Sequence, residues 1–364
     1  MSDRFTRRSI PIALLLGGVL VLGAAPPTHK THNVIFVMTD GLRWQEVFRG
    51  ADAALMDKEH GHVSDVAALR RAYWRDIAQE RRELLMPFLW REIAETGQIF
   101  GNRDRGSEAS VTNTFNLSYP GYNEALTGFA DPRVTSNDPM PNPNVTVLEW
   151  LNQKPAYRGR VAALAGWDTF NAILNPQRAG FPINAGYEPF LPGEMTPRLE
   201  LLNQLKAEMT RTFESVPLDS IPFYTAVEYI RLKKPQVLFL SLGETDEWAH
   251  LGEYAQYLDA AHRADAYLRV LWSTLQAMPE YRGSTTLIFG TDHGRGDGGE
   301  DWKGHGARLP DSKYVWMSFL GPDTRPLGER SAVAPITENQ IAATIAALLG
   351  EGYGIGKPIA EVMP

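Results

Sequence analysis

Five nearly continuous runs of apolar residues are spread along the chain, over residues 33–39, 160–165, 235–242, 285–290 and 314–320. Apolar runs without alternation are typical of strands buried on both faces, as in a parallel sheet. Between the runs, apolar residues recur near the 3.6-residue helical period, which predicts helices over residues 87–96, 146–152, 197–212, 254–278 and 338–349. Because strands alternate with helices, the sequence predicts an α/β fold with a doubly wound, mostly parallel sheet flanked by helices.

Two loop-like segments interrupt this pattern. Residues 131–144 are rich in proline and asparagine, and residues 294–306 are rich in glycine and charge. Strand and helix patterns continue across both segments, so we interpret neither as a domain boundary. We therefore expect one domain over residues 33–364, preceded by a short linker over residues 26–32.

The first 25 residues have the pattern of an export signal. Arg4, Arg7 and Arg8 precede an apolar run over residues 10–25 that ends in small side chains. This run is shorter than the ~20 residues that span a bilayer, so we predict a signal peptide over residues 1–25 and no stable membrane association after its cleavage. The protein is then periplasmic or secreted, by the general or the twin-arginine export route. An uncleaved N-terminal anchor is the alternative.

Composition narrows the chemistry. The chain has no cysteine, which excludes disulfides, thiolate metal sites and a cysteine nucleophile. Its 43 acidic and 36 basic side chains give a net charge of −7, which argues against nucleic acid as a partner because such proteins present a basic face.

Carboxylates and imidazoles follow three of the predicted strands. Asp40 directly follows the first predicted strand, Asp246 and His250 follow the third, and the Asp292–His293 pair follows the fourth. One further imidazole, His305, lies in the glycine-rich loop. The carboxyl ends of parallel strands meet at one edge of a sheet, so these groups are expected to converge there. Mixed carboxylate and imidazole ligands suit Zn²⁺, and also Mn²⁺ or Fe²⁺, and the set is large enough for two ions.

A serine in a turn before a short helix supplies a candidate nucleophile. Ser118 precedes Tyr-Pro-Gly, and a helical pattern follows over residues 122–126. The simplest interpretation is an N-terminal helix cap. The same position also favours bound anions, and a metal ion there would activate the hydroxyl.

Taken in order, these motifs resemble the alkaline phosphatase superfamily, and in particular its nucleotide pyrophosphatase/phosphodiesterases and single-domain periplasmic alkaline phosphatases. The similarity covers residues 33 to about 350. It rests on the segments Thr39-Asp40-Gly41, Ser118-x-Pro-Gly with Leu-Thr-Gly128, Asp246-x-x-x-His250, Asp292-His293-Gly294 and His305-Gly306.

The resemblance implies a catalytic domain that hydrolyses phosphate mono- or diesters through a phosphoseryl intermediate on Ser118. It implies two divalent ions, expected to be Zn²⁺, and a small phosphate ester as the partner. One ion would be held by Asp246, His250 and His305, and the other by Asp40, Ser118, Asp292 and His293. The alternatives are a sulfatase-like or phosphoglycerate-mutase-like member of the superfamily, or a binding protein that keeps the metals without the chemistry.

Some assignments stay open at this stage. Tyr122 stands where sulfatases need Arg for maturation of the nucleophile, which favours phosphate over sulfate. The resemblance also implies an Asn that holds phosphate oxygens, for which Asn137, Asn142 and Asn144 are alternatives. Trp167, Phe170 and Tyr187 would line an ester pocket or belong to the core. We interpret Arg295 and Lys303 as solvated loop residues.

Overall fold

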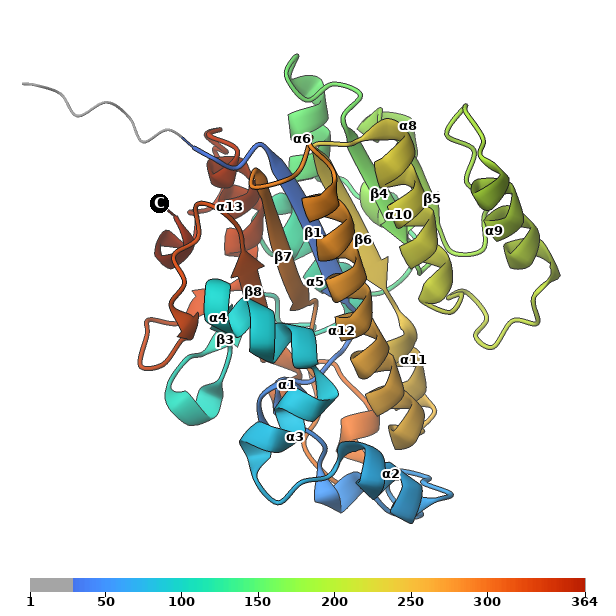
Figure 1. The fold of residues 1–364 in the computed structure, drawn as a ribbon, viewed down its shortest axis with the longest axis vertical. Helices are drawn as coiled ribbons and strands as arrows, with labels where there is room; N and C mark the ends of the chain where they lie inside the picture. Colours follow the sequence, from blue (N-terminus) through green and yellow to red (C-terminus); the bar gives the residue numbers. More distant parts are fainter. Residues whose placement is uncertain (1–28, 364) are drawn as a thin grey trace, which may run out of the picture.

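The computed structural model describes residues 29–363, so the predicted signal peptide and the beginning of the predicted linker lie outside the described residues (Figure 1). Its centre is an eight-stranded sheet with the order β5-β4-β6-β1-β7-β8-β2-β9. The strands are β1 (Asn33–Thr39), β2 (Gln98–Phe100), β4 (Val161–Ala165), β5 (Ile183–Ala185), β6 (Val237–Leu242), β7 (Thr285–Thr291), β8 (Met317–Leu320) and β9 (Gly328–Glu329). A separate two-stranded sheet pairs β3 (Ala109–Ser110) with β10 (Ile336–Thr337).

The five strands from β5 to β7 are mutually parallel, whereas β8 runs antiparallel to both of its neighbours. The α/β class and the mostly parallel sheet predicted from the sequence are confirmed. The antiparallel direction of β8 could not be predicted, because an apolar run carries no information about strand direction.

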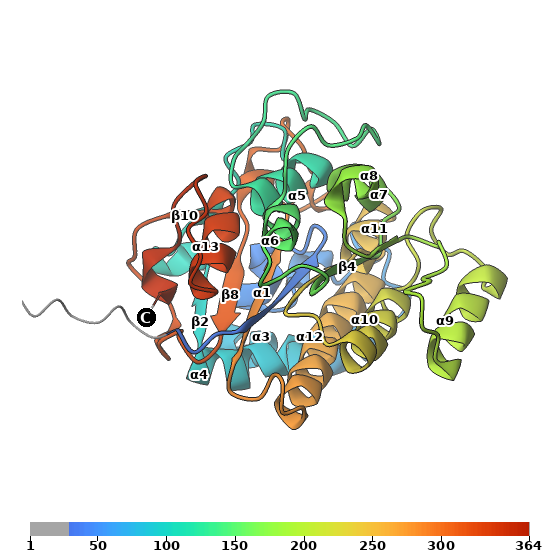
Figure 2. The same cartoon turned by 90° about the horizontal axis from the view of Figure 1, so that it is seen from above.

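Helices cover both faces of the sheet (Figures 1 and 2). Alternate β1 side chains enter two separate cores: Ile35 and Val37 pack on one face, and Val34, Phe36 and Met38 pack on the other. Burial on both faces explains the unbroken apolar runs. The first core includes α10 (Ser220–Lys233) and α12 (Tyr254–Ala277), and the second includes α5 (Ser118–Thr127), α6 (Val147–Gln153) and α13 (Ile341–Leu348).

The remaining α-helices lie in the connections between the strands of the large sheet. They are α1 (Trp44–Arg49), α2 (Val66–Tyr73), α3 (Ala78–Leu85), α4 (Ala94–Thr96), α7 (Phe170–Leu174), α8 (Pro176–Ala179), α9 (Pro197–Glu208) and α11 (Glu244–His250). The helix predicted over residues 87–96 contains a π-helical turn, Leu89–Ile93, and α9 ends four residues before the predicted limit. The sequence did not predict α10.

The described end of the predicted linker is attached to the sheet layer. The backbone amides of Lys30 and Thr31 donate to the Asp323 carboxylate at 3.0 and 2.8 Å. Among residues 29–363, no helix combines the length and the apolar character needed to cross a bilayer.

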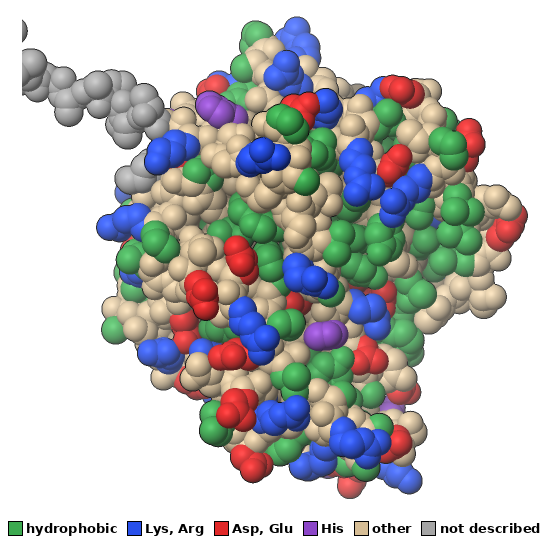
Figure 3. Space-filling model, in the orientation of Figure 1, with side chains coloured by type: hydrophobic (Ala, Val, Ile, Leu, Met, Phe, Trp, Pro, Cys, Tyr) green, Lys and Arg blue, Asp and Glu red, His purple; other side chains and the backbone are tan. Residues whose placement is uncertain are grey.

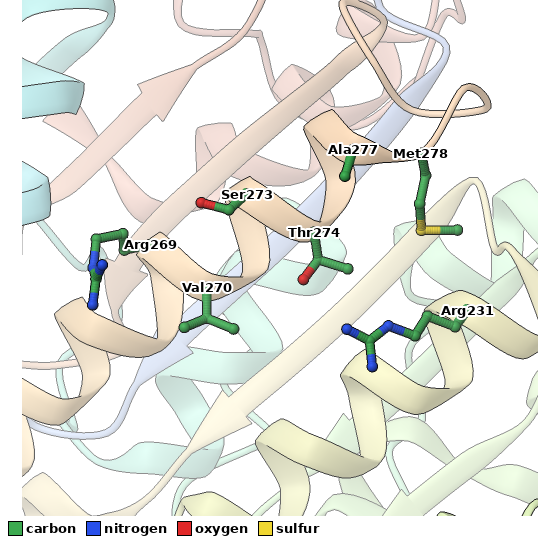
Figure 4. Close-up of a pocket in the computed structure, with 7 residues that line it drawn as sticks. All are labelled: Arg231, Arg269, Val270, Ser273, Thr274, Ala277 and Met278. Atoms are coloured by element: carbon green, nitrogen blue, oxygen red, sulfur yellow. The ribbon is translucent and has the colours of Figure 1, made fainter.

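A cavity of about 680 Å³ lies on the outer face between α10 and α12 (Figure 4). Arg231 comes from α10, and the other lining residues, from Arg269 to Met278, come from the C-terminal half of α12 and its end. On this face of the molecule, basic and acidic side chains are interspersed with hydrophobic ones (Figure 3). Because α12 returns the chain from the end of β6 to the start of β7, this cavity lies away from the carboxyl ends of the strands.

A buried glutamate beside α5 leads to a stability prediction. Both carboxyl oxygens of Glu338, which precedes α13, lack a hydrogen-bond partner among the described residues. Burial raises its pKa well above the usual range, and the nearby Glu124 and Asp292 carboxylates add to this. The unfolded chain loses this proton near pH 4.3, so above about that pH the folded state binds more protons than the unfolded state. The contribution of Glu338 to stability therefore falls as the pH rises.

Glu338→Gln should accordingly raise the free energy of unfolding by about 1–3 kcal/mol at pH 8, by an amount that grows from pH 5 to pH 8. Chemical denaturation of both proteins over this pH range measures the difference. Glu124→Gln is the matched control: that carboxylate accepts hydrogen bonds from the Thr112 and Asn113 backbone amides, so its loss should destabilise the fold. A loss of stability in Glu338→Gln at every pH would contradict the interpretation.

Candidate metal centre

The three central strands bring the predicted ligands together. In the sheet β1 lies between β6 and β7, with Thr39 in register with both Leu242 and Thr291. Asp40 therefore leaves β1 beside the turns that follow the other two strands. Those turns carry Asp246 in α11 and the Asp292–His293 pair after β7. All the predicted acidic and imidazole ligands meet at this carboxyl edge, in two groups.

Asp40, Asp292 and His293 form the first group, which is buried. The Nε2 atom of His293 lies 3.3 Å from Asp40 Oδ1 and 3.6 Å from Asp292 Oδ2. Burial raises the pKa values of both aspartates well above their usual range, and a neighbouring carboxylate adds to this effect, Asp246 for Asp40 and Asp40 for Asp292. A divalent cation placed between them would reverse this effect.

Ser118 adjoins the same group. Its Oγ lies 3.4 Å from Asp40 Oδ1 and 3.2 Å from His293 Nε2. The N-cap of α5 is Leu117, so Ser118 is the first residue of the helix rather than the predicted cap, and it still lies at the positive end of the helix dipole. Gly121, one turn further on, allows this approach: a β-carbon there would meet the Asp292 carbonyl oxygen at 2.3 Å.

The second group contains Asp246, His250 and His305. His250 Nε2 lies 3.1 Å from Asp246 Oδ2 and 3.2 Å from His305 Nε2. The two groups are close to each other, since His293 Nε2 is 4.0 Å from Asp246 Oδ1 and the His293 and His305 rings stack at 3.8 Å.

Backbone carbonyls fix the orientation of two imidazoles. His293 Nδ1 lies 2.8 Å from the Gly294 carbonyl oxygen, and His305 Nδ1 lies 3.0 Å from that of Asn116. Each carbonyl accepts a hydrogen bond from the Nδ1–H group, so the lone pair of the neutral ring is on Nε2, which faces the carboxylates. Burial lowers the pKa of His293 to about 4, which keeps this ring neutral.

These contacts fit divalent metal ions. Asp292 Oδ2 is buried and has no hydrogen-bond partner among the described residues, although Oδ1 accepts from the Gly41 amide. His250 and His305 present ring nitrogens to each other at hydrogen-bonding distance. A cation would satisfy the unpartnered carboxylate oxygen and the ring nitrogens that crowd together here, and the donor set suits Zn²⁺.

Arg295 is the clearest correction to the sequence analysis. Its guanidinium is fully buried, not solvated: it pairs with Asp246, and its Nη2 lies 3.2 Å from His250 Nδ1. Burial alone would raise the pKa of Asp246, but Arg295 and His250 hold it well below the usual range. Lys303, by contrast, pairs with the exposed Glu300 in the loop at 2.7 Å.

Tyr122 has a supporting role that the sequence did not reveal. Its ring is buried beneath the site, and its hydroxyl donates to Asp40 Oδ2 at 3.1 Å. Tyr122 therefore orients Asp40, a candidate metal ligand, and does not line the cavity at the site. A tyrosine at this spacing gives no signal for this role in the sequence, since the contact depends on packing between α5 and β1.

A small cavity of about 110 Å³ opens onto the site. It is lined by Asp40, Ser118, Asn137, Trp167, Val216, Gly243, Asp246 and Glu247. Of the three asparagine alternatives, only Asn137 lines it. Asn142 and Asn144 are buried, and both donate to Asn123 Oδ1, at 3.2 and 3.1 Å.

Solved structures identify the architecture. No family profile matches the sequence, and no curated protein matches it. The crystal structure of the alkaline phosphatase PafA superposes with a TM-score of 0.62 at 12% identity, over 94% of this chain and 100% of PafA. The chain has the alkaline phosphatase superfamily fold.

Other proteins with this fold differ in what they bind. Murine ectonucleotide pyrophosphatase/phosphodiesterase 5, solved with AMP, matches with a TM-score of 0.53 at 12% identity, over 90% of this chain and 97% of that one. A protein solved with its substrate D-glucosamine-2-N,6-O-disulfate matches with a TM-score of 0.55 at 12% identity, over 91% and 82%. The alkaline phosphatase fold alone therefore does not distinguish phosphate from sulfate esters as substrates. The residues of the site have to be considered for that distinction.

Proposed function

We propose that this chain is an exported two-metal phosphoesterase that acts on small phosphodiesters through a covalent intermediate on Ser118. The observation that carries the proposal is the position of the Ser118 hydroxyl. It lies at hydrogen-bonding distance from Asp40 and His293, at the N-terminus of a helix and on the wall of the cavity. That arrangement suits attack on an anionic ester bound in the cavity.

The reaction proceeds in two displacements. Ser118 Oγ gives up its proton to solvent and forms a bond to phosphorus, while the bond from phosphorus to the leaving oxygen breaks. That oxygen takes up a proton from solvent and leaves as the alcohol. Water then displaces Ser118 and releases the phosphate with its remaining ester group. Divalent ions, which we propose are Zn²⁺ held by the two ligand groups, would activate the serine hydroxyl and offset charge on the attacking and leaving oxygens.

Asn137 is positioned to hold a phosphate oxygen. Its Oδ1 accepts from the Tyr119 amide at 2.9 Å, which fixes the side chain and leaves Nδ2 free to donate into the cavity. The backbone amide of Tyr119 directly follows the nucleophile, so this hydrogen bond fixes the position of Asn137 relative to Ser118.

The lining of the cavity favours a diester over a monoester. Trp167 and Val216 give it an apolar wall, which suits an ester substituent, and no Lys or Arg is among its described lining residues. A monoester carries one more negative charge, for which these lining side chains offer no cation beyond the proposed metal ions. Phe170 is fully buried in the core, and the Tyr187 hydroxyl donates to the Phe213 and Val216 carbonyls, so neither supplies that wall directly.

Sulfate esters are less well suited. Tyr122, at the position where sulfatase maturation needs Arg, is buried and donates to Asp40. Nothing in the site favours phosphoglycerate-mutase-like transfer, and an intact nucleophile argues against a purely binding role. Residues 1–25 as an export signal and residues 33–364 as one catalytic domain remain part of the proposal.

Purified protein loaded with Zn²⁺ should hydrolyse bis-p-nitrophenyl phosphate with a higher kcat/KM than p-nitrophenyl phosphate. It should leave p-nitrophenyl sulfate intact, because the nucleophile is an unmodified serine. Nitrophenolate absorbance measures all three reactions. A preference for the monoester would refute the diester assignment, and cleavage of the sulfate alone would refute phosphoesterase function.

A further inference from the structure

One acidic side chain in the cavity has no part in the reaction proposed above. Glu247 lines the same small cavity as Ser118 and follows Asp246 directly in α11, but it belongs to neither ligand group. Its carboxylate makes no hydrogen bond or ion pair with any of the described side chains, and the lining residues supply no basic group.

The basic side chains around Glu247 are engaged elsewhere. Arg295 pairs with Asp246, and its Nη2 lies 3.2 Å from His250 Nδ1. Arg211 stacks over the Tyr187 ring at 4.4 Å, and its Nη1 donates to the Glu214 carbonyl at 3.4 Å. No ion pair joins it to Glu247 within the described residues. A carboxylate that faces a substrate cavity and forms no ion pair with a protein side chain can receive its positive partner from the ligand.

An aromatic wall accompanies this carboxylate. Trp167, which follows β4, lines the cavity together with Glu247. Its ring packs edge-on against the buried Phe170, with centroids 6.5 Å apart, which fixes its orientation. A carboxylate and an indole that share one small cavity form the usual surroundings of a bound ammonium group, since the ring face and the anion both attract a cation.

The shape of this wall is set by close packing. Val216 reaches the cavity because the Tyr187 hydroxyl holds the neighbouring backbone, at 3.1 Å from the Phe213 carbonyl oxygen and 3.2 Å from that of Val216. A β-carbon at Gly243 would lie 2.6 Å from a Val216 methyl group. The wall is therefore built from the segment before α10 packed against the start of α11, and the two parts hold each other in place.

We propose that Glu247 and Trp167 form a subsite for a cationic substituent of the ester, and that the substrates are zwitterionic phosphodiesters carrying a primary or quaternary ammonium group. This inference rests on the proposed phosphodiesterase function. The same carboxylate disfavours the additional negative charge of a monoester, so it selects against one class while it attracts the other.

The test compares two aryl phosphodiesters of nearly equal shape. One carries choline as its second alcohol, and the other carries 3,3-dimethylbutanol, in which carbon replaces the charged nitrogen. Phosphorus NMR measures the rate at which each ester disappears, so that cleavage of either of its two ester bonds is counted. The wild-type protein should favour the cationic ester by about tenfold or more in kcat/KM.

Glu247→Gln keeps the shape of the side chain and removes its charge, so this preference should fall to nearly one. Trp167→Leu should reduce the preference as well. Glu200→Gln, at an exposed glutamate in α9, is the matched control and should keep the wild-type preference. Equal turnover of the two esters by the wild-type protein, or an unchanged preference in Glu247→Gln, would overturn the subsite.

A binding measurement separates this inference from the proposed function. Calorimetry on the metal-loaded Ser118→Ala variant should show tighter binding of the choline ester than of its neutral analogue, and Glu247→Gln in the same background should remove the difference. If the wild-type protein hydrolyses neither ester, the proposed function fails, and the calorimetric difference still decides whether the subsite exists.

Discussion

Replacement of Ser118 by alanine should lower kcat for phosphodiester hydrolysis by about 10⁴-fold or more, the range seen when a covalent nucleophile is removed from a hydrolase. The hydroxyl lines the small cavity, at 3.2 Å from His293 Nε2 and 3.4 Å from Asp40 Oδ1. The remaining members of the site would still bind the ester, so KM should change far less than kcat. Steady-state kinetics with an aryl phosphodiester measures both constants.

Two further variants make this result specific. Ser118→Thr keeps a hydroxyl and should be much more active than Ser118→Ala. Ser136→Ala removes a hydroxyl that bonds to Asp138 in the neighbouring loop and should behave like the wild-type protein. Activity in Ser118→Ala close to that of the wild-type protein would remove the nucleophile from the mechanism.

Removal of the metal ions should abolish activity and also destabilise the fold. Asp40 and Asp292 are both buried, and burial together with the repulsion of a neighbouring carboxylate disfavours their charged forms. An ion present at about 1,000 times its dissociation constant adds about 4 kcal/mol to the free energy of unfolding, so two ions should contribute several kcal/mol together. Denaturation with and without chelator measures this difference, and elemental analysis should find two equivalents of metal.

A variant of one ligand group distinguishes the two sites. His305→Ala removes a ligand from the group with Asp246 and His250, so about one equivalent of metal should remain bound. Chelation should then lower the free energy of unfolding of this variant by about half as much as it lowers that of the wild-type protein. An unchanged free energy of unfolding after complete chelation of the wild-type protein would mean that the carboxylates and imidazoles do not hold ions.

Most of the ligands could be found from the sequence because they follow buried strands. An unbroken apolar run marks a strand covered on both faces, and parallel strands place their carboxyl ends at one edge. That reasoning located Asp40, Asp246 and Asp292, and the structure brings them together with the predicted imidazoles. Their assignment to two groups came from the resemblance to a family, since spacing along the chain does not measure distances between loops.

The supporting residues could not be found in this way. Arg295 reads as a charged residue in a glycine-rich loop, and only the folded path of that loop buries it against Asp246. Tyr122 reads as an aromatic residue in a helix, and its bond to Asp40 depends on how closely α5 approaches β1. Glu247 reads as one of several acidic residues in α11, and its place in the cavity depends on which face of that helix meets Ser118.

The central claim, covalent catalysis by Ser118, is tested most directly by the intermediate itself. Metal-loaded protein can be quenched in acid during turnover of an aryl phosphodiester and digested, and its peptides analysed by mass spectrometry. We predict that the peptide with Ser118 carries the phosphoryl group together with its remaining ester substituent, and that chelated protein carries none. Rapid turnover with Ser118 unmodified at every quench time, and with the phosphoryl group on no other residue, would contradict the account.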